Sequence, residues 1–130
     1  MKDILLIFGG ILGGLSVLFG AFGAHALKNK FSGELQKNFE TGVRYQMYHA
    51  LIIIISGVIF PFIKTSQQIM GWCFILGVIL FSFSIYGLCL SSANNNKWKF
   101  LGPITPLGGL LLLIGWILFT INASEIAIYL

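Results

Sequence analysis

The stretch GGILGGLSVLFGAFGAHALKNK, residues Gly9 to Lys30, contains no Asp, Glu, Lys or Arg before Lys28. Together with Ile4 to Phe8 it forms an apolar run of about 24 residues, enough for a helix to cross a bilayer. Lys2 and the small residues around His25 also fit a secretory signal, but the run is longer than a usual signal core. We therefore predict a membrane span that is retained in the protein.

The rest of the chain repeats this pattern. Of its 130 residues, 57% are hydrophobic and only 9% are charged, whereas about a quarter of the residues of soluble proteins are charged. Apolar runs separated by short polar segments predict four spans, at about 4–27, 47–63, 69–91 and 104–121. Segments this long favour helices over barrel strands. The sequence predicts an all-α membrane protein, a four-helix bundle forming a single domain.

The basic residues predict how the bundle is oriented. The connection between the first two spans contains Lys28, Lys30, Lys37 and Arg44, and the third connection contains Lys97 and Lys99. The opposite side has only Lys2 and Lys64. Loops one and three are thus expected to be cytoplasmic, with both termini outside. Aromatic residues predicted as interfacial anchors are Trp72, Trp98, Trp116, Tyr45, Tyr48 and Tyr129.

The connection before the second span has helical periodicity. Apolar residues recur every four positions, at Phe31, Leu35, Phe39, Val43 and Met47. Ser32 can cap the start of such a helix. The pattern predicts an amphipathic interfacial helix between spans one and two, which either bends or continues into the second span. The alternative is an ordinary connecting helix packed on the bundle.

Small residues form a stripe along the first span. Spacings of four and three residues bring together Gly9, Gly13, Ser16, Gly20 and Gly23. Small residues at this spacing let helix backbones approach closely in lipid. We predict that the stripe packs tightly, either at the centre of the bundle or at the seam of a homo-oligomer; a ligand groove lined by glycine is the alternative. Thr105, Gly108 and Gly115 repeat the pattern in the fourth span.

Polar residues gather near the start of the second predicted span. His25 ends the first span and His49 begins the second, so both are expected at the cytoplasmic edge. The predicted cluster of ligand-binding or lipid-binding candidates comprises His25, His49, Tyr45, Gln46, Tyr48, Arg44, Lys28 and Lys30. Ionisable groups at membrane depth suggest function, but a histidine that caps a helix or joins two helices is an equally physical explanation.

Catalytic and metal motifs are missing from the sequence. Two histidines without nearby Cys or acidic ligands make an incomplete metal site. Cys73 and Cys89 are separated by about 24 Å on one helix, too far for a disulfide within the chain. No acidic residue lies inside a predicted span. We predict no metal, no cofactor and no enzymatic activity, and the basic residues form no nucleic-acid motif.

Four motifs in order resemble the domain of unknown function 423 family. They are Gly20–His25 in the first span, Tyr45-Gln46 with His49–Leu51 in the second, Phe81-Ser82 with Tyr86 in the third, and Leu101–Gly109 with Gly115-Trp116 in the fourth. Phe83 departs from the glycine expected between two serines. The resemblance implies a compact four-span bundle of bacterial cytoplasmic membranes, with relatives in animals, and implies no activity.

We expect the protein to bind one of three partners at the cytoplasmic edge: anionic membrane lipid, a small ligand or a partner protein. A small oligomeric transporter or channel is the main alternative, although only scattered Ser, Thr and Gly could line its path. An intramembrane lipid enzyme with His25 or His49 as general base is a third class, without an identifiable nucleophile.

Overall fold

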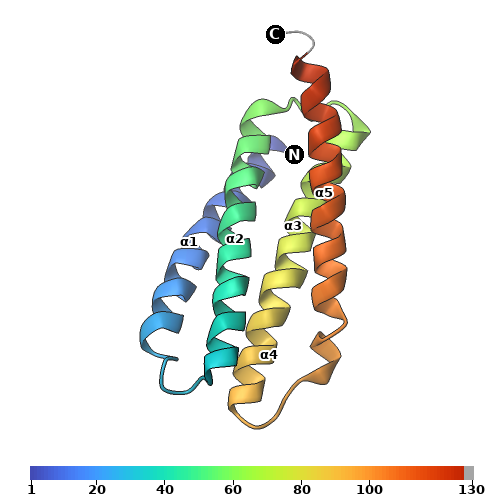
Figure 1. Ribbon diagram of the computed structural model, residues 1–130. Helices are drawn as coiled ribbons and strands as arrows, with labels where there is room; N and C mark the ends of the chain where they lie inside the picture. Colours follow the sequence, from blue (N-terminus) through green and yellow to red (C-terminus); the bar gives the residue numbers. More distant parts are fainter. Residues whose placement is uncertain (128–130) are drawn as a thin grey trace.

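The computed structural model describes residues 1–127, which form four long antiparallel helical segments. The N-terminus, the end of the last described helix and the second connection lie at one end of the molecule, and the first and third connections lie at the other (Figure 1). We call these the terminal end and the basic end. Each segment is long and apolar enough to cross a membrane, which confirms the predicted fold class.

The first segment is α1, Lys2–His25, and the second is α2, Gly33–Ile59. The Ser32 side chain accepts a hydrogen bond from the Leu35 amide at 3.2 Å, so the predicted cap is confirmed. At its other end α2 stops at Phe60, whose extended backbone is the conformation that the following Pro61 favours.

The third segment has three parts: α3, Thr65–Val78, then a π-helical turn η1, Ile79–Phe83, then α4, Ser84–Ala93. A 3₁₀ turn η2, Lys99–Leu101, precedes the last helix α5, Ile104–Ala127. Pro103 and Pro106 flank the start of α5, where missing backbone donors cost little.

The second helix begins at Gly33, directly after the predicted cap Ser32, and continues without a break into the span predicted from about Met47. Polar residues lower the hydropathy of the first turns of this helix, and those at Glu34, Lys37, Asn38 and Glu40 are exposed. The apolar row packs on the bundle, with Phe31 and Phe39 buried and Leu35 and Val43 partly buried. The amphipathic segment therefore continues into the second span, and its apolar face covers the bundle.

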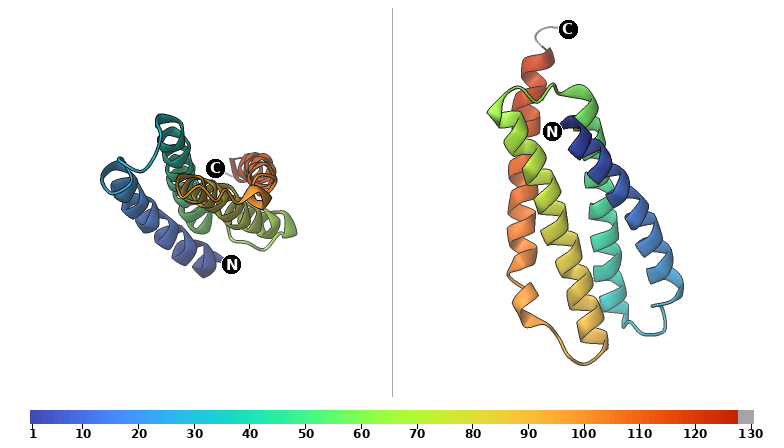
Figure 2. Two further views of the ribbon diagram at one scale, coloured as in Figure 1. Left: turned by 90° about the horizontal axis from the view of Figure 1, so that it is seen from below. Right: turned by 180° about the vertical axis from the view of Figure 1, so that it is seen from behind.

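The helices are arranged in sequence across the molecule. Viewed along the bundle, α1 and α5 lie on opposite sides, with α2 and the α3–α4 segment between them (Figure 2). Towards the terminal end α1 meets α3, where Leu5 contacts Gly71. The buried apolar residues form two clusters, one around Phe60 and Phe74 near the terminal end, the other around Phe39 and Tyr86 near the basic end.

Candidate functional site

The predicted polar residues of α2 point in different directions. Gln46 and His49 are buried, with 0% and 4% of their surface exposed. Tyr45 and Tyr48 are exposed, and Arg44 also lies on the outside of the helix. Helical geometry explains this separation, since successive residues turn by about 100°. The segment therefore supplies two buried hydrogen-bonding groups and a separate outer face.

His49 connects α2 to α5. Its Nδ1 lies 2.7 Å from the Tyr45 carbonyl oxygen, and its Nε2 lies 3.2 Å from Trp116 Nε1. A carbonyl can only accept and an indole N–H can only donate, so the ring is neutral, with its proton on Nδ1. Both ring nitrogens thus have partners within the protein. Trp116, predicted as an interfacial anchor, instead lies midway along α5; Tyr129, another predicted anchor, lies outside the described residues.

Gln46 connects three helices. Its Nε2 donates to the Leu12 carbonyl of α1 at 2.8 Å, and its Oε1 accepts from the Tyr86 hydroxyl of α4 at 2.6 Å. One turn away, the Ser82 hydroxyl donates to the Gly42 carbonyl at 2.8 Å. Buried polar groups in lipid need such partners because no water is available. This layer of polar contacts separates the two apolar clusters and fixes how α1, α2 and α4 meet.

His25 lies far from His49, so the predicted cluster at one edge does not form. Gly23 packs against Phe39, whereas Gly13 packs against Ala50, next to His49. Phe39 and His49 are ten residues apart in α2, which corresponds to about 15 Å along the helix at 1.5 Å per residue. The prediction placed both histidines at one edge because it began the second membrane span near Met47, whereas the helix that contains His49 already begins at Gly33. His25 is exposed at the end of α1, and Lys28 and Lys30 are exposed in the connection that follows.

The small-residue stripe of α1 faces α2. Gly9, Ser16 and Gly23 are buried, and a methyl group added at Gly9 would lie 3.1 Å from the Ala50 carbonyl oxygen. The predicted tight packing is therefore found inside the chain, and the stripe is not free to form a seam between copies. Beside it, a cavity of about 330 Å³ is lined by Gly20, Gly23, Ala24, Phe39, Glu40, Val43 and Arg44.

A second cavity of about 330 Å³ lies at the basic end, between α2, α4 and the chain that enters α5. Its lining residues are Leu35, Asn38, Thr41, Ile85, Leu88, Cys89, Ser92, Lys97, Gly102 and Thr105. None of them belongs to the predicted set. They come from four separate stretches of sequence, so no local spacing could have found them; the only signal was the polar segment from Ser91 to Lys97.

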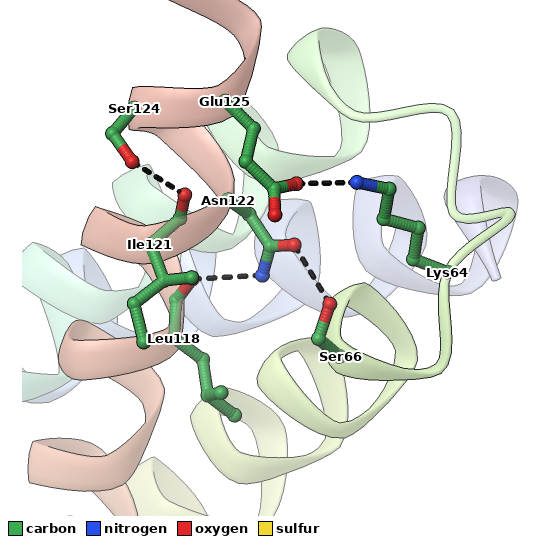
Figure 3. A network of polar contacts seen from close by, with 7 residues as sticks. All are labelled: Lys64, Ser66, Leu118, Ile121, Asn122, Ser124 and Glu125. Carbon is green, nitrogen blue, oxygen red and sulfur yellow. Dashed lines mark hydrogen bonds and ion pairs between the residues drawn. The ribbon is translucent and has the colours of Figure 1, made fainter.

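A network of polar contacts closes the terminal end (Figure 3). Lys64, in the second connection, forms an ion pair with Glu125 of α5. Beside it, the Ser66 hydroxyl donates to Asn122 Oδ1 at 2.8 Å, and Asn122 Nδ2 donates to the Leu118 carbonyl at 2.7 Å. These contacts attach α5 to the start of α3. Within residues 1–127, no three His, Cys, Asp or Glu side chains gather as a metal site would require.

The sequence comparisons agree with this architecture. The family described as "Protein of unknown function (DUF423)" matches residues 19–109. The chain belongs to the DUF423 family. A relative named UPF0382 membrane protein, from Staphylococcus haemolyticus, is 41% identical over 122 residues, covering 94% of this chain and 96% of its own length.

Other DUF423 relatives carry similar names. The UPF0382 membrane protein YwdK of Bacillus subtilis is 36% identical over 124 residues, covering 94% of this chain and 97% of its own length. A Staphylococcus saprophyticus relative is 34% identical over 123 residues. No solved structure matches the chain. The relatives are thus named membrane proteins of a family of unknown function, and this chain has four helical segments long and apolar enough to span a membrane.

Proposed function

We propose that the protein binds anionic membrane lipid at its basic end, without catalysing a reaction. The observation that carries the proposal is the unpaired positive charge there. The basic end carries Lys28, Lys30, Lys37, Lys97 and Lys99, with only Glu34 and Glu40 as acidic residues, and Arg44 lies about 17 Å along α2 from its start. In the described part of the chain the one ion pair, Lys64 with Glu125, lies at the opposite end. The basic side chains are therefore available to anions outside the protein.

The energetics favour lipid as the source of those anions. A basic residue near an anionic membrane surface contributes about 1 kcal/mol of attraction. The excess of basic residues also favours a cytoplasmic position for this end, because Lys and Arg accumulate in cytoplasmic loops. The polar groups deeper in the bundle are a weaker basis for function, since His49 and Gln46 already bond to Trp116 and Tyr86. No observation favours the transporter alternative over lipid binding.

Oligomerisation stays a prediction. The surface that suggested it, the stripe from Gly9 to Gly23, packs on α2 within one chain. A homo-oligomer would need another surface, such as the outer side of α1, where nothing lies within 4 Å of a methyl group added at Gly10 or Gly14.

The selectivity of the protein for lipids tests the proposal. The full chain is reconstituted in phosphatidylcholine vesicles that carry spin-labelled phosphatidylglycerol or spin-labelled phosphatidylcholine. Electron paramagnetic resonance then measures the fraction of each labelled lipid held at the protein. We expect phosphatidylglycerol to be favoured, and added salt to reduce the preference because salt screens exposed charges.

A pair of variants locates the effect. The double variant Lys28→Gln and Lys30→Gln should lower the preference for phosphatidylglycerol, whereas Lys2→Gln, at the terminal end, should leave it unchanged. Equal retention of the two labelled lipids by the unmodified protein, at low and high salt, would contradict the proposal.

A further inference from the structure

The cavity between α2, α4 and the chain entering α5 has two kinds of wall. Apolar side chains of Leu35, Ile85 and Leu88 form one part, together with the buried Cys89. Asn38, Thr41, Ser92, Thr105 and Lys97 supply polar groups to the other. A site of this composition suits an amphiphile, whose apolar part contacts the first wall and whose polar part contacts the second.

The polar wall contains groups that are not used by the protein. Thr41 bonds to the Lys37 carbonyl and Thr105 to Ser84, at 3.0 and 2.6 Å. By contrast, the side chains of Asn38 and Ser92 have no hydrogen-bond partner among the described residues, and Lys97 has no acidic partner there. An amide, a hydroxyl and an ammonium group can all donate to one acceptor-rich group.

Charge and position select an anion. Lys97 is the only charged residue in the lining, so the site has a positive charge without a compensating carboxylate. The cavity lies at the basic end, where its lining comes from the first turns of α2, from α4 and from the chain entering α5. We expect lipid headgroups at this depth, because the ends of membrane-spanning helices lie near the bilayer surface. Its volume of about 330 Å³ is at the small end of ligand sites, enough for a headgroup and the first part of a chain.

We propose that this cavity binds one phosphate-bearing amphiphile, with the phosphate at Lys97, Asn38 and Ser92 and the apolar part against Leu35, Ile85 and Leu88. This inference extends the proposed function from a basic surface, which attracts many lipids, to one defined site with a stoichiometry of one. The two proposals can fail separately. Attraction of lipid to the basic surface depends on how many basic residues remain, whereas binding in the cavity depends on Lys97 in particular.

The test is calorimetric titration of the purified full chain in a neutral detergent. The probes are dihexanoyl phosphatidic acid, the matched zwitterion dihexanoyl phosphatidylcholine, and inorganic phosphate. We expect one molecule of dihexanoyl phosphatidic acid to bind per chain, more tightly than the zwitterion. Competition by inorganic phosphate would identify a free phosphate compound as the natural ligand; no competition would identify a lipid headgroup held together with its chain. Either result supports the site.

Two variants separate the cavity from the surface. Lys97→Gln should weaken binding of dihexanoyl phosphatidic acid by about tenfold, because a charge-assisted hydrogen bond is lost. Lys99→Gln makes the same change of charge in η2, outside the lining, and should weaken binding by less than about twofold. Leu88→Trp should abolish binding by filling the cavity without changing any charge, and gel filtration verifies that this variant is folded.

Two results would overturn the inference. One is the absence of a binding heat for dihexanoyl phosphatidic acid. The other is an equal loss in Lys97→Gln and Lys99→Gln together with unchanged binding in Leu88→Trp; this second result would leave the lipid selectivity of the basic end intact.

Discussion

His49 shows how the position of a single residue within its helix decides its role. At 1.5 Å per residue it lies about 24 Å from the start of α2 and about 15 Å from its end. A charged imidazole at such a depth is costly, and the neutral ring can donate from Nδ1 to the Tyr45 carbonyl while its Nε2 accepts from the Trp116 N–H. His49 therefore serves to join α2 to α5.

The contribution of this contact can be measured with Trp116→Phe. The variant keeps an aromatic ring but removes the N–H group, which leaves His49 Nε2 buried without a donor. We expect a loss of about 1–3 kcal/mol, seen as a lower midpoint of thermal unfolding in detergent. Trp72→Phe is the matched control, because Trp72 is exposed and makes no hydrogen bond within residues 1–127. Equal midpoints for the two variants would refute a stabilising role for the contact.

The hydroxyl of Tyr86 allows an independent test of the polar layer. Tyr86→Phe removes the donor to Gln46 Oε1 and leaves that oxygen unpartnered inside the bundle. A similar loss of about 1–3 kcal/mol is expected from the same unfolding measurement. Tyr48→Phe, at an exposed position of α2, should have no effect. If Tyr86→Phe is as stable as the unmodified protein, water or another group must satisfy Gln46.

At the scale of elements, α5 packs against the π-helical turn through glycine. A methyl group added at Gly108 would overlap the backbone nitrogen and Cα of Phe81 in η1. Further along, Gly115 faces the ring of Phe74 and Gly77 of α3 faces Leu112. The stripe that the sequence shows in the fourth span is thus a second close helix contact, which complements the one between α1 and α2.

Gly108→Ala tests this contact. A backbone cannot move aside as a flexible side chain can, so the variant should lose about 1–3 kcal/mol of stability through overpacking. Gly109→Ala is the neighbouring control, since its methyl group would meet only the Phe81 ring, at 3.7 Å, an ordinary contact distance. Thermal unfolding of both variants in the same detergent gives the comparison. A stable Gly108→Ala protein would mean that α5 is free to shift along η1.

At the scale of the whole molecule, the distribution of charge distinguishes the two ends. Five of the eight basic residues lie at the basic end, Arg44 lies further along α2, and the terminal end has Lys2 and the paired Lys64. The first and third connections lie at the same end (Figure 1). The uneven distribution of Lys and Arg between the two ends therefore favours one orientation of the whole bundle in the membrane.

Labelling of cysteines in intact bacteria measures that orientation. With Cys73 and Cys89 replaced by alanine, Thr65→Cys should react with a membrane-impermeant maleimide from outside. Asn96→Cys should react only after the membrane is permeabilised. Both positions are exposed, so differences in burial do not affect the comparison. The reverse labelling pattern would place the basic end outside and would remove the basis for cytoplasmic lipid binding.

The sequence by itself determined the class of fold, because a helix that crosses lipid must consist of about 20 apolar residues and this requirement can be seen locally. It also showed the stripe of small residues that includes Gly9, Ser16 and Gly23, without showing which helix packs on it, and the excess of positive charge in two of the connections. Tertiary structure alone decided the partners of Gln46 and the contact of His49 with Trp116. The same holds for the cavity that contains Lys97. In each of these cases the residues that meet are separated by tens of positions in the sequence, and only the packing of whole helices brings them into contact.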